Sequence, residues 1–122
     1  MKNYHLKYRL NISHSVDSDR SKEHNHIFEI EVYAYPEDDT FVEFGDMEKL
    51  VEDVLSKYQK RYLNDMPEFE GDTSVENVGE VLYGSLSKHF EDMRWNFKRM
   101  EISETPLRVY VIAKYNYHGG RE

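Results

Sequence analysis

The amino-acid sequence predicts one α+β domain, in which two helices cover one face of a four-stranded antiparallel sheet. Three observations support this fold class. Both ends of the 122-residue chain contain stretches in which apolar and polar residues alternate, two central stretches carry apolar residues at helical spacing, and turn residues separate them. The predicted order is β-β-α-α-β-β in a single domain over residues 1–122, with an ordered core over about 4–116 and a loose tail at 117–122.

The first two strands are predicted at residues 5–13 and 26–35. In each of them, every second residue is apolar, which is the pattern of a strand with one buried face. These residues are Leu6, Tyr8, Leu10 and Ile12 in the first strand and Phe28, Ile30, Val32 and Ala34 in the second. Residues 15–23 are polar throughout and predict a loop, and residues 36–39 predict a turn.

Two helices are predicted in the middle of the chain. The first begins with Asp46 as its N-cap and continues at helical spacing to Tyr58. The second begins at Thr73 and Ser74, and the spacing from Thr73 to Glu76 is that of a capping box. Its apolar face continues to His89 or Phe90.

The last two strands are predicted at residues 98–105 and 107–115. Met100, Ile102 and Glu104 alternate along the first of them, and Pro106 separates the pair.

The charge balance and the absence of cysteine exclude several classes of function. The formal net charge is 16 − 24 = −8, and such an acidic field repels phosphate backbones and anionic lipid, so we expect no nucleic-acid or membrane partner. Without cysteine there is no disulfide, no thiolate zinc site and no cysteine nucleophile. Apolar runs are short and no signal region follows Met1, so we expect a cytoplasmic protein.

The apolar content is low for a globular chain of this length. Without the 10 tyrosines, and with the 6 glycines counted, it is roughly 35%, below the ~45–50% that is usual. Because the aromatic content and the clear periodicity argue against disorder, we expect an oligomer whose subunits share buried surface.

Three histidines form a candidate metal site. His24 and His26 are two residues apart at the start of the second predicted strand, so their side chains lie on the same face. His14 ends the first strand, which pairs antiparallel with the second, so all three imidazoles can converge. Three histidines with an open fourth position are typical of catalytic zinc. The alternative is that these are three loop-edge histidines without a metal.

The histidines and several other segments resemble the 6-pyruvoyltetrahydropterin synthase and 6-carboxytetrahydropterin synthase family. In that family, a histidine at the end of the first strand is followed by His-Gly-His, where this chain has His24-Asn25-His26. Four more segments are similar, in the same order over about residues 5–115: Phe41 to Met47, Leu63 to Pro67, Thr73 to Asn77, and Ser103-Glu104-Thr105.

The resemblance implies a tunnelling fold, in which subunits pair their sheets into a trimeric barrel and two trimers usually stack. The protein would then be a homotrimer or homohexamer, with active sites at subunit interfaces and zinc ligands from one chain. The implied activity is that of a zinc-dependent lyase acting on 7,8-dihydroneopterin triphosphate or a related pterin. The pathway stays open, because the queuosine, folate and biopterin branches share this fold.

The resemblance also implies substrate-binding residues. Glu104 and Thr105 correspond to the Glu-Thr that anchors the pterin ring. A carboxylate can accept two adjacent N–H groups of a 2-aminopyrimidinone. Ser74 either helps to position the ring through its hydroxyl or only caps a helix.

The residues that move protons in the family are replaced here. The family's usual base is a cysteine shortly before His-Gly-His, and the family's Asp-His pair falls on Gln59 and Lys60 of this chain. Four residues are candidates for a substitute base: Asp17, Asp19, Glu23 and Lys60. Glu23 adjoins His24 and therefore lies on the opposite face of the strand, which counts against it.

Three functions follow from these observations. The first is a pterin synthase with altered proton-transfer residues. The second is an oligomer that binds zinc and pterin but has lost catalysis. The third is a structural oligomer in which the histidines serve assembly, and the histidine triad together with Glu104 counts against it.

Overall fold

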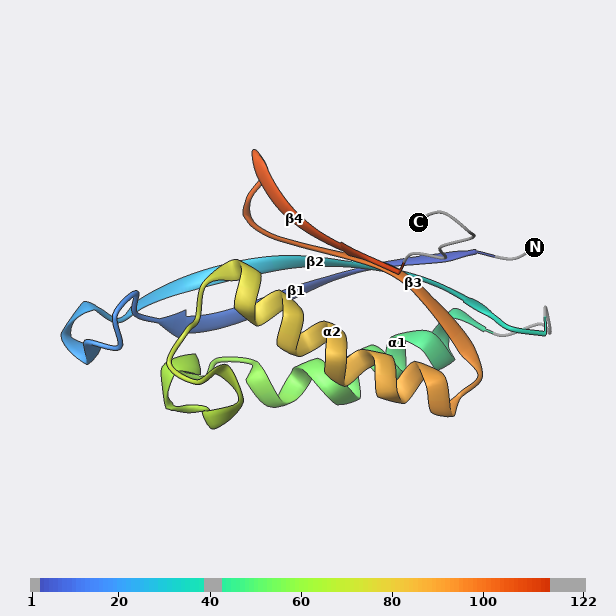
Figure 1. The fold of residues 1–122 in the computed structure, drawn as a ribbon, viewed down its shortest axis with the longest axis horizontal. Helices are drawn as coiled ribbons and strands as arrows, with labels where there is room; N and C mark the ends of the chain where they lie inside the picture. The colour runs from blue at the N-terminus through green and yellow to red at the C-terminus, as the bar shows by residue number, and fades with distance from the viewer. Residues whose placement is uncertain (1–2, 39–42, 115–122) are drawn as a thin grey trace, which may run out of the picture.

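The computed structural model describes residues 3–38 and 43–114, which form a single antiparallel sheet with two helices on one face (Figure 1). Its strands follow one another in the order β1-β2-β3-β4. The elements are β1 (Tyr4–His14), β2 (His24–Pro36), α1 (Phe44–Leu55), α2 (Val75–Asp92), β3 (Trp95–Thr105) and β4 (Arg108–Ala113). The predicted α+β class and element order are therefore confirmed. The predicted tail at 117–122 and part of the Phe41 to Met47 segment lie outside the described residues.

Both helices begin and end at residues other than those predicted. Helix α1 starts at Phe44 with Glu43 as its N-cap, so Asp46 lies in the first turn, where its carboxylate faces the positive end of the helix dipole. The helix ends at Leu55 and tightens into a 3-10 turn that contains Tyr58. Ser74, whose Oγ accepts the N–H of Asn77 at 3.3 Å, caps α2.

The predicted capping box from Thr73 to Glu76 is wrong, and the reason is chemical. The Thr73 side chain is buried, and its hydroxyl lies within hydrogen-bonding distance of the Ser15 carbonyl oxygen and the Asn64 side chain instead of an α2 amide. This contact ties the start of α2 to the loop that follows β1.

Strand β3 begins three residues before its predicted start. A bulge between Tyr33 and Ala34 of β2 shifts the register, so Arg99 and Phe97 lie opposite consecutive β2 residues. The extra residue inverts the alternation, and Trp95 and Phe97 share the buried face with Met100 and Ile102. A prediction that assumes strict alternation of buried and exposed residues therefore misses the first residues of β3.

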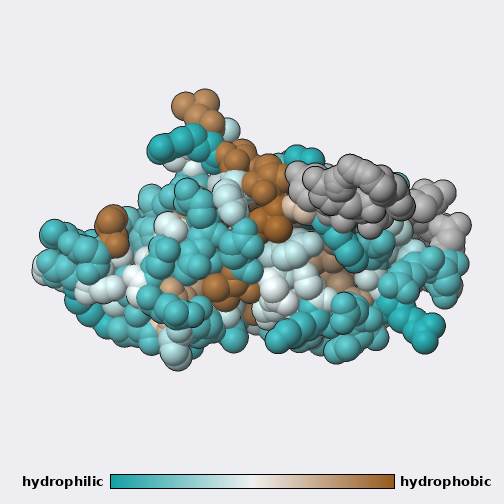
Figure 2. All heavy atoms as spheres, viewed as in Figure 1, coloured by the Kyte–Doolittle hydropathy of each residue, from teal (hydrophilic) through white to brown (hydrophobic). Residues whose placement is uncertain are grey.

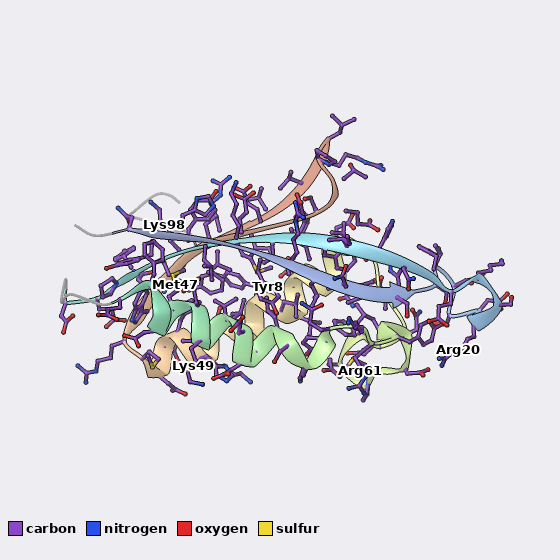
Figure 3. The ribbon with its side chains drawn as sticks, turned by 180° about the vertical axis from the view of Figure 1, so that it is seen from behind. Tyr8, Arg20, Met47, Lys49, Arg61 and Lys98 are labelled. Atoms are coloured by element: carbon purple, nitrogen blue, oxygen red, sulfur yellow. The ribbon has the colours of Figure 1, made fainter. Side chains whose placement is uncertain are left out.

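The hydrophobic core lies between the sheet and the helices. Met47 is buried between α1 and the sheet, whereas Lys49 of the same helix points away from it (Figure 3). Gly79 lets α2 approach β3 closely, because a Cβ at this position would lie 2.9 Å from Cγ2 of Ile102. In the described residues no helix is long and apolar enough to cross a membrane.

Residues 59–62 run along the outer edge of β1. The Lys60 amide donates to the Asn11 carbonyl oxygen at 2.6 Å, and the Ser13 amide donates to the Arg61 carbonyl oxygen at 2.9 Å. The Gln59 side chain accepts the Asn11 amide and donates to the Arg9 carbonyl oxygen. This segment therefore fixes the chain at the end of β1 that carries His14.

Candidate metal centre

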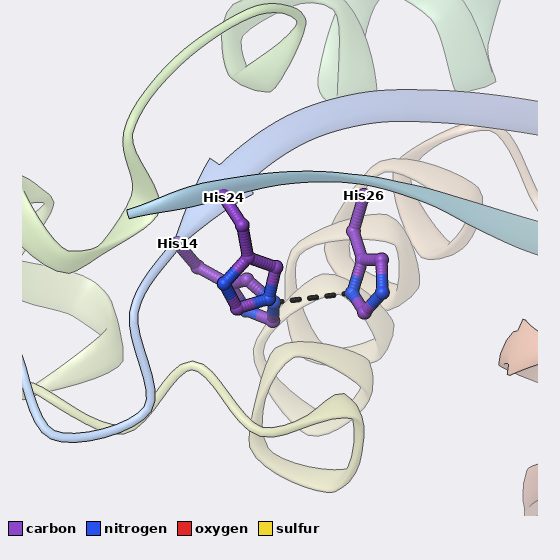
Figure 4. A group of neighbouring side chains, drawn as sticks. All are labelled: His14, His24 and His26. Atoms are coloured by element: carbon purple, nitrogen blue, oxygen red, sulfur yellow. Dashed lines mark hydrogen bonds between the residues drawn. The ribbon is translucent and has the colours of Figure 1, made fainter. Parts of the chain in front are cut away.

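The pairing of β1 with β2 brings the three predicted histidines together. His14 lies opposite His24, and Ile12 lies opposite His26, so all three imidazoles project from one face of the sheet (Figure 4). One nitrogen from each ring lies within 4.8 Å of the other two. The shortest of these separations is 3.2 Å, between Nε2 of His14 and Nδ1 of His26.

Backbone carbonyl groups orient two of the rings. Nδ1 of His14 lies 3.1 Å from the Thr73 carbonyl oxygen, and Nδ1 of His24 lies 3.2 Å from the Lys22 carbonyl oxygen. When each Nδ1–H donates to its carbonyl, Nε2 keeps a free lone pair. Histidines that bind metals in proteins are held in this way.

Burial lowers the pKa of His14 below its usual range. The His14 side chain is 7% exposed, and removal from water disfavours the charged imidazolium. His14 is therefore held in the neutral form, which is the form that binds a metal.

A hydrogen-bonded clamp behind His14 was not predicted from the sequence. The Asn64 side chain accepts the Ser15 amide and donates to the Ser15 carbonyl oxygen, both at 2.9 Å, in the manner of a neighbouring strand. The Thr73 hydroxyl lies 3.2 Å from the Asn64 side-chain oxygen, and the Thr73 carbonyl oxygen contacts His14. The family resemblance could have pointed to these two residues, because Asn64 and Thr73 belong to two of the segments that are similar to the family.

Glu104 is the acidic residue that contacts the histidines among the described residues. Its Oε2 lies 2.8 Å from Nδ1 of His26 and 4.0 Å from Nε2 of His14. It lies on the same strand face as Met100 and Ile102, so the alternation that predicts β3 also directs Glu104 towards the histidines.

Two cavities meet at Glu104. The larger, of about 600 Å³, is also lined by Asn25, His26 and Lys60. The smaller, of about 240 Å³, is lined by Glu104, Thr105 and Arg108 among others. Ser74 caps α2 immediately before Val75, which lines this smaller cavity.

The three acidic candidates for the base have polar partners of their own. Asp17 pairs with Lys22 at 3.2 Å, and the amide of Asp19 holds the pKa of the Asp17 carboxyl below its usual range. A carboxylate of Asp19 accepts the amide of Ser21. None of these contacts reaches the histidines.

Glu23, the third of these acids, bonds to the opposite face of the sheet. Its Oε2 accepts the Ser13 hydroxyl at 2.6 Å, and its Oε1 lies 3.5 Å from Nε of Arg20. Of the four candidate bases, Lys60 is the one that lines the larger cavity with His26 and Glu104.

The donor set fits zinc on chemical grounds. Two nitrogens on a tetrahedral zinc with bonds of about 2.0–2.1 Å lie roughly 3.3 Å apart. The 3.2 Å between His14 and His26 is close to that value. The His14 ring is held neutral and, like that of His24, is oriented by a carbonyl, so little rearrangement is needed to receive the ion.

Comparisons with known proteins agree with this fold. The family profile described as 6-pyruvoyl tetrahydropterin synthase matches residues 4–114. Among curated proteins, none matches the chain.

Similar solved structures cover nearly the whole chain. The 6-pyruvoyl tetrahydropterin synthase of Caenorhabditis elegans is 17% identical, with 93% of this chain and 96% of that chain covered and a TM-score of 0.74. The Plasmodium falciparum protein of the same name is 14% identical, with 93% and 99% covered and a TM-score of 0.58. An uncharacterized Wolinella succinogenes protein is 9% identical, with 94% and 100% covered and a TM-score of 0.63.

These likenesses show the tunnelling fold, and the profile match spans most of the sequence. This chain therefore belongs to the 6-pyruvoyl tetrahydropterin synthase family.

Proposed function

We propose that this protein is a zinc-dependent synthase of the lyase type, which acts on 7,8-dihydroneopterin triphosphate or a related pterin. The observation that carries the proposal is the convergence of His14, His24 and His26 beside the cavity of about 600 Å³. Family membership supports pterin chemistry at this position.

The three histidines would hold the metal. A bound zinc supplies Lewis acidity, which lowers the pKa of a substrate hydroxyl or polarises a carbonyl. The carbonyl oxygens of Thr73 and Lys22 keep the His14 and His24 rings in place for that role.

Glu104 is the proposed anchor of the pterin ring, with Thr105 and Ser74 in supporting roles. Its carboxylate can accept two adjacent N–H groups from the ring, which gives both affinity and orientation. Glu104 and Thr105 line the same cavity, and Ser74 adjoins it through Val75.

Lys60 is the proton-transfer residue that the cavity favours, because it faces the same space as His26 and Glu104. A carboxylate base has a precedent: two Plasmodium vivax structures, each 14% identical to this chain, carry substitutions of a glutamate described as a catalytic residue. Asp17, Asp19 and Glu23 are the corresponding candidates here.

A second candidate function is zinc and pterin binding without catalysis. The observation that favours it is that Asp17, Asp19 and Glu23 all have polar partners away from the histidines.

Product analysis separates the two functions. Zinc-loaded protein is incubated with 7,8-dihydroneopterin triphosphate, and the mixture is analysed by mass spectrometry, with His26→Ala as the metal-site control. A new pterin product that requires His26 supports the synthase. Unchanged substrate that nevertheless binds, as measured by calorimetry, supports the binding protein, and neither product nor binding contradicts both.

The anchoring role of Glu104 predicts a preference for pterin over lumazine, which has an oxygen in place of the 2-amino group. We expect pterin to bind about 10-fold more tightly, which corresponds to one hydrogen bond of ~1.4 kcal/mol. In Glu104→Gln this preference should disappear, whatever the substitution does to the metal. An unchanged preference would remove Glu104 from the ring site.

We also propose that the protein assembles as a homotrimer or homohexamer through the edges of its sheet. Val109 and Val111 of β4 are 47% and 43% exposed, and hydrophobic side chains run along this strand from the tip of its hairpin (Figure 2). An apolar strand at a sheet edge favours pairing with another chain.

A further inference from the structure

Glu104 occupies an unusual position at the end of β3. Its neighbour Ser103 pairs with Glu29 of β2 and with Val109 of β4, and the register with β4 then shifts before Thr105. Glu104 thus lies at the register shift with β4, on the strand face that it shares with Met100 and Ile102. Its side chain is 29% exposed, so it is accessible from the cavities without being free in solvent.

The carboxylate of Glu104 reaches two of the three histidines, although it lies outside the group of ligand atoms that are all within 4.8 Å of one another. Donor atoms on a tetrahedral zinc lie roughly 3.3 Å apart. The distances from Oε2 of Glu104 to the nitrogens of His26 and His14, 2.8 and 4.0 Å, lie on either side of that value. Within residues 3–38 and 43–114, the ion-pair contacts of this carboxylate are with His26 and His14.

The carboxylate approaches the histidines from the side of His26, which it contacts at 2.8 Å, against 4.0 Å for His14. Nδ1 of His14 and Nδ1 of His24 face the carbonyl oxygens of Thr73 and Lys22, which leaves Nε2 of each ring as the nitrogen that can bind a metal. His26 presents Nδ1 to both Nε2 of His14 and Oε2 of Glu104. Nδ1 of His26 therefore lies between the nitrogen of a second histidine and the carboxylate.

We propose that Glu104 closes the metal site as its fourth ligand in the resting protein, and that an oxygen of the substrate side chain displaces it. The inference rests on the proposed metal site and concerns what occupies its fourth position before a ligand arrives. The released carboxylate remains at the junction of the two cavities, where Arg108 lines the smaller one and Lys60 the larger. The same group is then available to accept the ring N–H groups.

The first test measures metal affinity and needs no pterin. Glu104→Gln is compared with Glu101→Gln. The control removes an equal charge from the same strand, but Glu101 pairs with Arg99 instead of the histidines. We expect zinc affinity to fall about 10–100-fold in the first variant, as for lost groups at metal sites, and to be unchanged in the second. The visible absorption of the cobalt-substituted protein should shift only in the first.

The second test asks whether the fourth position is closed. Thiocyanate is titrated into cobalt-substituted wild type and Glu104→Ala, after circular dichroism has shown that both fold. We expect the anion to bind the variant about 10-fold more tightly or better, because it no longer competes with a carboxylate. Equal anion affinity in the two proteins, or zinc affinity and cobalt spectra unchanged in Glu104→Gln, would overturn the inference.

These outcomes are independent of the proposed reaction. If the metal and anion results hold while the pterin forms no product and does not bind, the closed site stands and the proposed function fails. If a product forms but substitution of Glu104 has no effect on the metal, the proposed function stands and the closed site fails.

Discussion

Asn64 connects two segments that lie far apart in the sequence, and its side-chain amide holds the loop after β1 against the start of α2. It pairs with both backbone groups of Ser15 and contacts Thr73, whose carbonyl oxygen faces His14. The position of His14 therefore depends on an amide whose own side-chain contacts are with Ser15, Ser18 and Thr73.

Asn64→Ala should lower both stability and zinc affinity. The free energy of unfolding should fall by about 1–3 kcal/mol, because buried backbone groups of Ser15 lose their partner. Zinc affinity should fall about 10-fold through misorientation of His14. Asn96→Ala is the matched control, since Asn96 donates to the Tyr35 hydroxyl on another part of the sheet. There, calorimetry should show lower stability with unchanged zinc affinity, and equal zinc loss in both variants would argue against the clamp.

Glu68 gives a pH-dependent contribution to stability. Its backbone amide, the hydroxyl of Tyr58 at 2.8 Å and Nζ of Lys57 at 3.4 Å hold the pKa of its carboxyl below the usual range. Because the unfolded chain binds this proton more readily, the contribution is present at neutral pH and is lost as the pH falls through about 4 towards the folded pKa.

Glu68→Gln should therefore destabilise the protein at pH 7 and have less effect at pH 3. Denaturant unfolding at several pH values measures this difference. The variant should show a shallower rise of stability between these two pH values than the wild type, and parallel curves would contradict the assignment.

Single residues also show what the sequence could and could not predict. The histidines were predictable because strand parity and one antiparallel pairing are local rules. The clamp was not, because Ser15 and Asn64 are 49 residues apart and only the folded chain brings them together. Glu104 was identified by resemblance as a ring anchor, and its contact with His26 needed the coordinates.

At the scale of elements, the packing of α2 on the sheet is set by glycine. Gly79 is buried, and an added Cβ would come within 2.9 Å of Ile102 and 3.4 Å of the Tyr110 ring. Ile102 is fully buried and branched, so it has no room to move away.

Gly79→Ala should destabilise the protein by about 1–3 kcal/mol, because the methyl group overpacks this contact. Gly84→Ala on the same helix is the control: nothing lies within 4 Å of its added Cβ, so the helix preference of alanine should stabilise by ~0.5–1 kcal/mol. Thermal unfolding of both variants measures whether each substitution lowers or raises the stability of the protein. If both substitutions stabilise, the close approach of α2 to β3 is wrong.

Strand boundaries were less predictable than element types. The register shift opposite Tyr33 and Ala34 makes Lys98 an extra residue in β3 and inverts the apolar alternation there, so a period of two finds only the second part of the strand. The capping residue of α2 was also mispredicted from the sequence. Thr73 has a side chain that can cap a helix, but its hydroxyl forms a tertiary contact with Asn64 instead.

At the scale of the whole molecule, the proposed assembly accounts for both the low apolar content and the exposed valines of β4. The chain buries a core between sheet and helices, yet Val109 and Val111 remain in contact with solvent along an outer strand. Burying them against another copy would recover about 25 cal/mol for each Å² of apolar surface.

The double variant Val109→Lys and Val111→Lys should be monomeric, whereas the wild type should form trimers or hexamers. Light scattering after size-exclusion chromatography measures the mass. Val16→Lys is the control, because Val16 is 87% exposed in the loop after β1. A monomeric wild type, or an assembly that survives the double substitution, would rule out the β4 edge as the contact.

The segment over residues 59–62 limits how such copies can join. It contacts backbone groups of Arg9, Asn11 and Ser13, so within the described part of β1 it restricts an added strand to the residues before Arg9. The six residues of β4 suit this short remaining length. In the proposed assembly, a partly covered edge would set the position at which a second copy pairs with β1 and would oppose the open-ended strand pairing that leads to fibrils.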